Sequence, residues 1–334
     1  RPEFALVYMY SDISQLPLFD RSPKNGFRCV NYIDIDKIPE KVFQLAEYTK
    51  LRDYYKEEPV SDAIFQAYKN QFLYDKTELD ADLYETDESS DDWTIEKITF
   101  NAAYGNERVL AYLYLPKETS PPYQTVIHFP NANAARWTSI KDNRHIFWVL
   151  DFILKNGRAV MYPVYKGTYE RQDGLTSERW VSQSHAHTEY LVKLVKDFSR
   201  SIDYLDTRPD IDSDKLAYLG ASWGGHLGAI IPAVEERLKA SILIVGGLRH
   251  RRRARPEADA INYVSRVTIP VLMLNGRYDY SFPLEMSVIP MYNLLGTPES
   301  DKLLKIYETD HNVAKNEFIK ETLNWLDKYL GPVK

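Results

Sequence analysis

The sequence predicts an α/β fold in which a mostly parallel, doubly wound sheet of eight strands is flanked by helices. Two β-rich runs around Gly105-Asn106 predict an antiparallel hairpin. Further β-rich runs then alternate with helical stretches, which is the order of strand–helix–strand units in a parallel sheet. Two interior runs, 242–245 and 271–274, are apolar without alternation, as expected for strands that are buried on both faces.

The expected elements follow one another from residue 93 to the end of the chain. The strands are expected at Trp93–Asn101, Arg108–Leu115, Gln124–Phe129, Arg158–Val164, Lys215–Gly220, Ser241–Val245, Pro270–Asn275 and Leu303–Glu308. The helices are expected at about Ser139–Lys155, His187–Leu205, Ser222–Val234, Leu284–Leu295 and Val313–Leu330.

The residues before this domain differ from it in composition and in hydrophobic pattern. Residues 36–92 predict an N-terminal helical extension, with helices over 37–79, the second of which runs from about Pro59 to about Tyr74. Residues 75–92 are rich in Asp and Glu, which predicts a solvated acidic linker. The α/β domain is therefore expected over residues 93–334.

The composition limits the classes of function and of partner. A formal net charge of −6 argues against nucleic-acid binding, because neutralising phosphates needs an excess of positive charge. No run of 18 apolar residues is present, so neither a transmembrane helix nor a membrane partner is expected. The single cysteine, Cys29, excludes an internal disulfide framework and fits a reducing compartment, which favours a cytoplasmic location.

The sequence also bears on metals, cofactors and the extent of the chain. No Cys/His cluster with metal-ligand spacing and no phosphate-binding glycine loop is present, so we expect no metal and no cofactor. Because the chain opens with Arg1 rather than Met, we expect it to be a piece of a longer protein.

The strongest chemical motif is Gly220-Ala221-Ser222-Trp223-Gly224, at the junction of an expected strand and helix. A sharp strand-to-helix turn exposes the serine hydroxyl above the sheet, and small residues must flank the serine to avoid a clash across the turn. Chance predicts about 0.04 such motifs in a chain of this composition. We therefore expect Ser222 to be a catalytic nucleophile.

A serine at its ordinary pKa needs a base, and three histidines follow Ser222. His226 is one helical turn beyond the serine, where its side chain is expected to pack. His250 stands in an arginine run. His311 follows the last expected strand, where a loop leaves the carboxyl edge of the sheet and where catalytic groups gather in open α/β sheets. We therefore expect His311 to be the base.

A carboxylate must orient the imidazole and stabilise its cation. Asp279 stands just past the seventh expected strand and is the best candidate, although it could instead cap a turn. Asp310 is adjacent to His311 and is poorly placed to fold back onto the ring. Glu257 and Asp259 come earlier in the chain, near the sixth strand.

The oxyanion hole needs two donors aimed at the developing negative charge. The backbone N–H of Trp223, directly after the serine, is the first candidate. The second is expected in the loop after the third strand, at Ala132 or alternatively at Asn131, because the familiar His-Gly-Gly run is absent there. Tyr165 could add a hydroxyl donor or could form an aromatic wall.

Two further features bear on the substrate pocket. Trp180, together with Trp223 and several tyrosines, predicts an aromatic-walled pocket for a small ester. The run Arg249–Arg255 contains five arginines in a segment where lids over the site often form. Arg249 and its neighbours could attract an anionic substrate, or the run could be a solvated surface loop.

With these motifs the chain resembles α/β-hydrolases, in particular the acetyl xylan esterase, dienelactone hydrolase and prolyl-oligopeptidase-like branches. The resemblance covers residues from about Trp93 to Lys334 and rests on Ser201–Leu205, Gly220–Gly225, Leu274–Asp279 and Asp310-His311. It implies the α/β-hydrolase fold and an esterase-like triad carried by Ser222, Asp279 and His311. The sequence departs from the pattern of these families at Pro130-Asn131, in the loop where the second oxyanion donor is expected.

A second resemblance covers residues 1–35. Phe19–Pro23 and Gly26–Val30 are similar to the tail of a formylglycine-generating-enzyme-like domain. Such domains occur in bacterial multidomain proteins, some of which also carry a protein kinase domain, so the resemblance implies covalently linked upstream domains. No kinase motif is present in these residues.

These features lead to one main hypothesis and two alternatives. The main hypothesis is a carboxylic ester hydrolase that acts on a small-molecule ester through a Ser-His-Asp triad and an acyl-enzyme. A serine peptidase of the prolyl-oligopeptidase type would share the triad but usually adds a propeller, for which no blade repeats are present. A non-catalytic regulatory module of a kinase-fused protein would not require all three residues.

Overall fold

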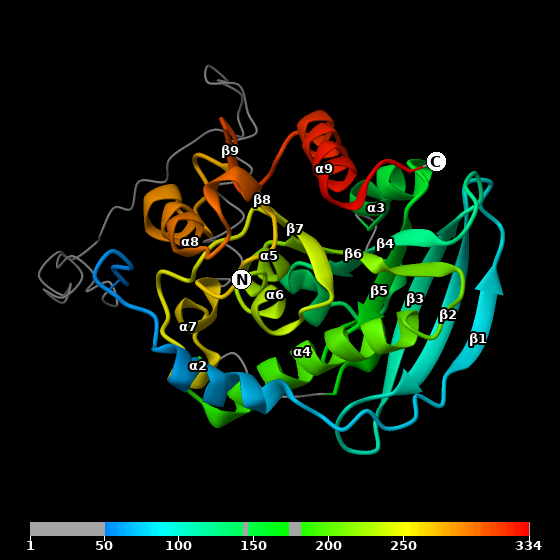
Figure 1. Cartoon of the computed structure of the whole chain (residues 1–334), viewed down its shortest axis with the longest axis horizontal. Helices are drawn as coiled ribbons and strands as arrows, with labels where there is room; N and C mark the ends of the chain where they lie inside the picture. The colour runs from blue at the N-terminus through cyan, green and yellow to red at the C-terminus, as the bar shows by residue number, and fades with distance from the viewer. Residues whose placement is uncertain (1–50, 143–145, 174–181, 334) are drawn as a thin grey trace, which may run out of the picture.

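The computed structural model describes residues 51–142, 146–173 and 182–333, and it confirms a mostly parallel sheet with helices on both faces (Figure 1). The strand order is β1-β2-β3-β5-β4-β6-β7-β8-β9, and the pairs from β5 to β9 are all parallel. The strands are β1 (Asp82–Asp87), β2 (Trp93–Asn101), β3 (Arg108–Pro116), β4 (Tyr123–Phe129), β5 (Ala159–Val164), β6 (Ile211–Ala221), β7 (Leu238–Ile244), β8 (Val271–Gly276) and β9 (Lys302–Tyr307).

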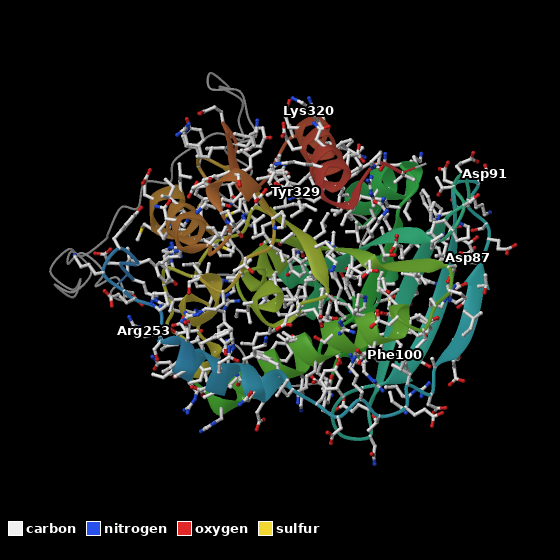
Figure 2. All side chains as sticks on the ribbon, viewed as in Figure 1. Asp87, Asp91, Phe100, Arg253, Lys320 and Tyr329 are labelled. Carbon is white, nitrogen blue, oxygen red and sulfur yellow. The ribbon has the colours of Figure 1, made fainter. Side chains whose placement is uncertain are left out.

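The sheet has nine strands in the described residues, so the prediction of eight was wrong by one. The extra strand, β1, lies inside the segment expected to be an acidic linker and pairs antiparallel with β2 at the edge of the sheet. All six of its residues are exposed, and Asp87 lies on this outer rim in Figure 2. Sequence periodicity reflects burial, and an edge strand without a buried face does not produce it.

The parallel strands bury side chains on both faces, as their apolar runs predicted. On β7, Leu243 points to one hydrophobic cluster, while Ile242 and Ile244 point to the other. The first cluster also contains side chains of the long helix α4, and the second contains side chains of α3 and α9. The sheet therefore forms the middle layer of three, which is the doubly wound arrangement.

The helices agree with the expected positions but two of them are interrupted. The helix expected over 222–234 is divided into two short helices, with Pro232 at the start of the second, and the one expected over 284–295 begins as a π-helical segment with Pro290 just after it. Proline lacks the N–H that a continuous helix needs. The α-helices are α2 (Asp62–Lys69), α3 (Ile146–Lys155), α4 (His185–Leu205), α5 (Trp223–Leu227), α6 (Ile231–Val234), α7 (Ile261–Val264), α8 (Ile289–Leu294) and α9 (Lys315–Leu330).

The described part of the N-terminal extension packs against the α/β domain. Helix α2 continues into a 3-10 turn at Asn70–Phe72, which agrees with the helix expected between Pro59 and Tyr74. Phe65 and Phe72 each make an edge-to-face contact with Tyr263 of α7, at 5.7 and 5.8 Å between ring centroids. The segment 1–35 lies outside the described ranges, and so does the start of the helix expected from residue 37.

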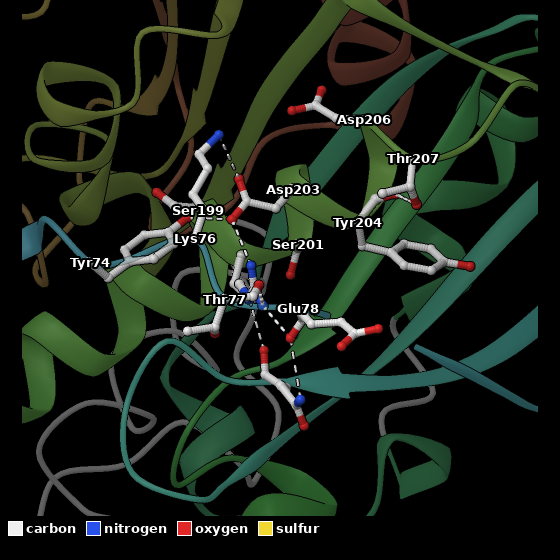
Figure 3. Close-up of polar contacts among 12 residues, drawn as sticks. Tyr74, Lys76, Thr77, Glu78, Ser199, Ser201, Asp203, Tyr204, Asp206 and Thr207 are labelled. Carbon is white, nitrogen blue, oxygen red and sulfur yellow. Dashed lines mark hydrogen bonds and ion pairs between the residues drawn. The ribbon is translucent and has the colours of Figure 1, made fainter. Parts of the chain in front are cut away.

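A network of polar contacts attaches the segment after α2 to α4, and Figure 3 shows it in close-up. The buried Arg200 guanidinium donates to the carbonyl oxygens of Thr77 (2.6 Å) and Glu78 (3.0 Å). The carboxylate of Asp203, one turn further along α4, accepts a hydrogen bond from the Tyr74 hydroxyl at 2.8 Å. These charge-assisted bonds fix the path by which the extension enters the sheet.

The described ranges contain neither a membrane-spanning helix nor a cluster of metal ligands. No helix there combines the length and the apolar character that crossing a membrane requires. Within the same ranges, no three His, Cys, Asp or Glu side chains lie close enough together to hold a metal ion.

His128 on β4 predicts that acid destabilises the fold. The residue is 4% exposed, and burial lowers the pKa of its imidazole to about 3. Below pH 6.5 the unfolded chain therefore binds a proton that the folded chain does not take up until near pH 3, so the free energy of unfolding falls with the pH. One such proton changes this free energy by about 1.4 kcal/mol per pH unit.

Urea unfolding at pH 6 and pH 5 measures this effect. His128→Gln should decrease the pH dependence by about 1.4 kcal/mol per pH unit, since glutamine does not titrate. The exposed His185 supplies the control, because His185→Gln should leave the dependence of the parent protein in place. A pH dependence that is identical in His128→Gln and the parent would contradict the prediction.

Candidate active site

Ser222 occupies a strained turn between β6 and α5. Its φ is 54° and its ψ is −98°, a region that residues with a Cβ rarely adopt. The Ser222 N–H donates to the carbonyl oxygen of Ile244 at 2.8 Å, and the N–H of Gly224 donates to that of Pro130 at 3.1 Å. A Cβ on Gly220 would overlap the carbonyl oxygen of Gly224, so the glycine is required by the close approach.

The structure brings Ser222, His311 and Asp279 together, as the sequence predicted. His311 Nε2 lies 2.8 Å from the Oγ of Ser222, and His311 Nδ1 lies 2.7 Å from the Oδ2 of Asp279. Because a carboxylate only accepts, Nδ1 carries the proton and Nε2 is left to accept one from the serine hydroxyl. This is the order of contacts that general-base activation of a serine requires.

The carboxylate of Asp279 is held by more than the imidazole. It is 2% exposed, and its Oδ1 accepts hydrogen bonds from the backbone N–H groups of Ser281 (2.8 Å) and Phe282 (3.0 Å). Its Oδ2 is therefore left to His311, and the carboxylate cannot rotate without losing both backbone bonds. A buried carboxylate with these partners can stabilise a positive imidazole.

The loops after β8 and β9 meet because the two parallel strands end at the same edge of the sheet. The N–H of Arg277 donates to the carbonyl oxygen of Tyr307 at 2.8 Å, and that of Tyr278 to Thr309 at 3.0 Å. A Cβ on Gly276 would overlap the carbonyl oxygen of Asp310, so the two loops approach to backbone contact. This contact places the residues after each strand side by side.

The two other histidines after Ser222 have different partners. His226 is buried, its Nδ1 lies 3.0 Å from the carbonyl oxygen of Gly247, and burial lowers the pKa of its imidazole well below 6.5. His250 is also buried, and its Nδ1 lies 3.2 Å from the Oγ of Ser287. His226 therefore packs below the serine, as expected, and neither ring contacts the serine hydroxyl.

Two of the alternative acids are engaged by arginines away from His311. Asp259 accepts from Arg52 at 2.9 Å, and Glu257 accepts from Arg255 at 2.6 Å. Asp279 is thus the carboxylate that the fold presents to the imidazole.

The loop after β4 presents two backbone amides beside the serine turn. The side chain of Asn131 accepts from the N–H of Asn133 at 3.0 Å, and the Asn131 carbonyl accepts from Ala134 at 3.2 Å. Within the described part of the chain, no acceptor contacts the N–H of Asn131 or of Ala132. Because Pro130 is bonded to Gly224, both amides stay near the amide of Trp223.

The structure describes only some of the predicted pocket residues, and it places Tyr165 in the core. Tyr165 is fully buried, stacks on Phe129 at 4.1 Å, and donates its hydroxyl to the carbonyl oxygen of His128 at 3.0 Å. The hydroxyl is therefore engaged within the core, which argues against an additional oxyanion donor, and the aromatic wall of a substrate pocket stays a prediction. Trp180 lies outside the described residues.

Arg249 is the third of the predicted pocket residues. It follows β7, is half-buried, and has its carbonyl oxygen bonded to the hydroxyl of Tyr54 at 2.9 Å. Residues 52–54 of the extension reach this loop, where the backbone N–H of Arg52 also donates to the carbonyl oxygen of His250. No pattern in the sequence predicted this contact. Contacts of this kind between distant segments leave no periodic signal in a sequence.

A second residue that the sequence reasoning missed is Phe282. Its ring stacks at 6.1 Å on His311 and at 6.4 Å on His226, so it fills the space between the two imidazoles. Its position three residues after Asp279, in a turn that the aspartate caps, was the available signal.

Comparisons with known proteins give the family of the chain and the proteins that share its fold. The model of the acetyl xylan esterase family matches residues 41–260 of the chain. The acetyl xylan esterase from Paenibacillus sp. R4 is 17% identical with a TM-score of 0.65, over 83% of this chain and 98% of that one.

Two further structures are similar in fold. Acetyl xylan esterase 1 from Thermoanaerobacterium sp. JW/SL YS485 is 18% identical, with a TM-score of 0.63 over 87% of this chain and 98% of that one. A cold-adapted esterase from an Arctic intertidal metagenomic library is 19% identical, with a TM-score of 0.58 over 76% and 100%. At these identities the likeness concerns the α/β-hydrolase fold, which the observed sheet shares.

The strained turn predicts a difference between two variants of Ser222. Both Ser222→Gly and Ser222→Ala lose the hydroxyl, but glycine also loses the Cβ that makes the observed φ and ψ unfavourable. Ser222→Gly should therefore have a free energy of unfolding about 1 kcal/mol higher than Ser222→Ala, as measured by urea denaturation. Equal stability of the two variants would argue against backbone strain at this turn.

Proposed function

We propose that this chain, which belongs to the acetyl xylan esterase family of ester hydrolases, hydrolyses carboxylic esters through an acyl-enzyme on Ser222. The observation that carries the proposal is the continuous set of hydrogen bonds from Ser222 through His311 to Asp279. The three groups follow the carboxyl ends of three different strands, which is where catalytic groups gather in open α/β sheets.

In the proposed mechanism, the Oγ of Ser222 attacks the ester carbonyl carbon while His311 Nε2 takes the hydroxyl proton. Asp279 keeps the imidazole in the required tautomer and stabilises its positive charge. His311 then gives the proton to the leaving alcohol, and an acyl-enzyme remains. The same imidazole then takes a proton from a water molecule, which attacks the acyl carbon. When the bond from the acyl carbon to Oγ breaks, the imidazole gives this proton to the Oγ of Ser222, and the acid is released.

The negative charge on the carbonyl oxygen requires two donors. We assign the backbone N–H of Trp223 and that of Ala132 to this role. The bond between Gly224 and Pro130 supports the assignment, because it holds the two loops against each other. Donors that are fixed before the reaction need no reorganisation when the charge develops, which is why they lower the barrier.

Removing the serine hydroxyl tests the proposal directly. Ser222→Ala should lower the turnover of short-chain 4-nitrophenyl esters by about 10⁴-fold or more, since the triad acts as a unit. Ser213→Ala, at the opposite end of β6, is the matched control and should keep the parent rate. A fluorophosphonate should label the parent protein but not Ser222→Ala.

The same assay distinguishes the alternatives. An aminoacyl-proline anilide turned over as efficiently as the esters would favour a prolyl-oligopeptidase-like peptidase instead. If no ester or amide is turned over and Ser222 is not labelled, both catalytic functions are rejected and a regulatory module is favoured.

Ala132→Pro tests the second oxyanion donor. Ala132 is the first residue of a 3-10 turn, where proline is tolerated, and Asn131 before it is extended at φ −75° and ψ 171°, as a residue before proline prefers. The substitution therefore removes the N–H with little change to the backbone. We expect kcat to fall about 10²- to 10³-fold.

Ala132→Gly, which keeps the N–H, should retain most of the parent kcat. If Ala132→Pro also keeps the parent kcat, the donor is assigned to the amide of Asn131. Thermal unfolding of both variants checks that the loop change leaves the fold intact.

A further inference from the structure

We infer that Arg249 binds a carboxylate of the substrate, so that the enzyme selects esters that carry a negative charge near the scissile bond. This inference rests on the proposed function, because it concerns the substrate of the same site. It adds a class of substrate that the contacts among Ser222, His311 and Asp279 do not define.

Arg249 is joined to the serine turn by a short path. His226 is one helical turn after Ser222, and its Nδ1 is hydrogen-bonded to the carbonyl oxygen of Gly247 at 3.0 Å. Arg249 follows Gly247 by two residues. Its guanidinium is near enough to His226 for its charge to contribute to the low pKa of that imidazole, after burial, which is the larger cause. The N–H of Ser222 is bonded to the carbonyl oxygen of Ile244 at the end of β7, so the loop that carries Arg249 leaves the sheet beside the serine turn.

The guanidinium of Arg249 has no counterion in the described part of the chain. No carboxylate, hydroxyl or carbonyl group there accepts a hydrogen bond from it. Burial, which is the largest cause, and the positive charge of Arg252 lower its pKa to about 10, with a smaller opposite effect of Tyr54. The group is still a cation at neutral pH, and a half-buried cation without an anion is unfavourable.

The other basic groups around Arg249 show what is missing there. Arg52 contacts Glu57 at 2.6 Å and Asp259 at 2.9 Å, so both of these acids are engaged. Arg253 also contacts Glu57, at 2.8 Å. The guanidinium of Arg251 covers the ring of Tyr280 at 4.4 Å. Glu57 and Asp259 are thus committed to other arginines.

The acidic residues of the edge strand β1 and of the turn that follows it lie far from this segment. Figure 2 shows Arg253 at one end of the molecule and Asp87 and Asp91 at the other, across the whole width of the sheet. The positive charge of Arg249 is therefore not balanced by the acidic edge strand, although the chain as a whole has a formal net charge of −6. The fitting anion is one that arrives with the substrate.

The backbone of Arg249 is fixed in place. The buried hydroxyl of Tyr54 donates to the Arg249 carbonyl oxygen at 2.9 Å, and the Arg52 guanidinium lies over the Tyr54 ring at 4.4 Å. A residue with a fixed backbone presents its side chain with less loss of entropy on binding. The planar guanidinium matches a carboxylate with two parallel hydrogen bonds, so a carboxylate is the expected ligand.

Two pairs of esters test the inference, with the carboxylate on either side of the scissile bond. One pair is 4-acetoxybenzoate and its methyl ester, and the other is mono-4-nitrophenyl glutarate and its methyl ester. The measured quantity is the ratio of kcat/KM for the anionic ester to that for its neutral partner. In at least one pair, Arg249→Met should lower this ratio about tenfold to a hundredfold, because a charged hydrogen bond is lost.

Arg253→Met is the matched control, since it removes an arginine of the same run that already has a carboxylate partner. It should leave both ratios at the parent values, whereas Arg249→Lys should give an intermediate ratio because it keeps the charge without the planar fork. Free glutarate should raise the Tm of the parent protein and not that of Arg249→Met. The Tm of Arg249→Met without ligand should not fall, because no buried partner is left unpaired.

The outcomes separate this inference from the proposed function. If the neutral esters are hydrolysed and Arg249→Met keeps the parent ratio in both pairs, the inference is overturned and the proposed function stands. If the parent protein hydrolyses none of the four esters, the proposed function fails and the inference fails with it. If Arg249→Met does not fold, the ratio of Arg249→Lys decides, and a parent-like ratio overturns the inference.

Discussion

The turn at Ser222 is the constraint on which the rest of the site depends. A serine with a φ of 54° is unfavourable by itself and persists only because its surroundings hold it. The N–H of Ser222 is bonded to Ile244 on β7, and that of Gly224 to Pro130 after β4. The strain is thus supported from both sides by the two strands that flank β6, and the loop with the amides of Asn131 and Ala132 is positioned by the same bonds.

The parallel order of the strands explains why three distant segments meet at this turn. The chain enters the site at the carboxyl ends of β6, β8 and β9, and the loops after β8 and β9 touch at backbone distance around Gly276. One carboxylate oxygen of Asp279 accepts hydrogen bonds from the N–H groups of its own turn, and the other accepts a hydrogen bond from His311. The imidazole between Asp279 and Ser222 therefore has little freedom, although the residues are far apart in the sequence.

The sequence could predict the parts of the molecule that repeat a pattern or obey a local rule. Buried strands such as β7, and a serine between two glycines at a strand-to-helix junction, have signatures of this kind. The exposed edge strand β1 has none, since burial is what produces alternation, and it was interpreted as a linker. The π-helical start of the segment at Leu284 and the contact of Tyr54 with Arg249 depend on tertiary packing, which single-sequence patterns do not contain.

Arg249 shows most clearly why charge has to be judged in three dimensions. In the sequence it is one of five arginines in a run, and such a run is usually a solvated face. In the fold, Arg253 and Arg255 have carboxylate partners, whereas Arg249 is half-buried with no anion in the described residues to meet it. Evolution tolerates an unfavourable buried charge chiefly where function compensates for it. A cation that costs stability in the free protein, on the loop that leaves the sheet beside a strained nucleophile, is best explained by a substrate that brings the missing negative charge.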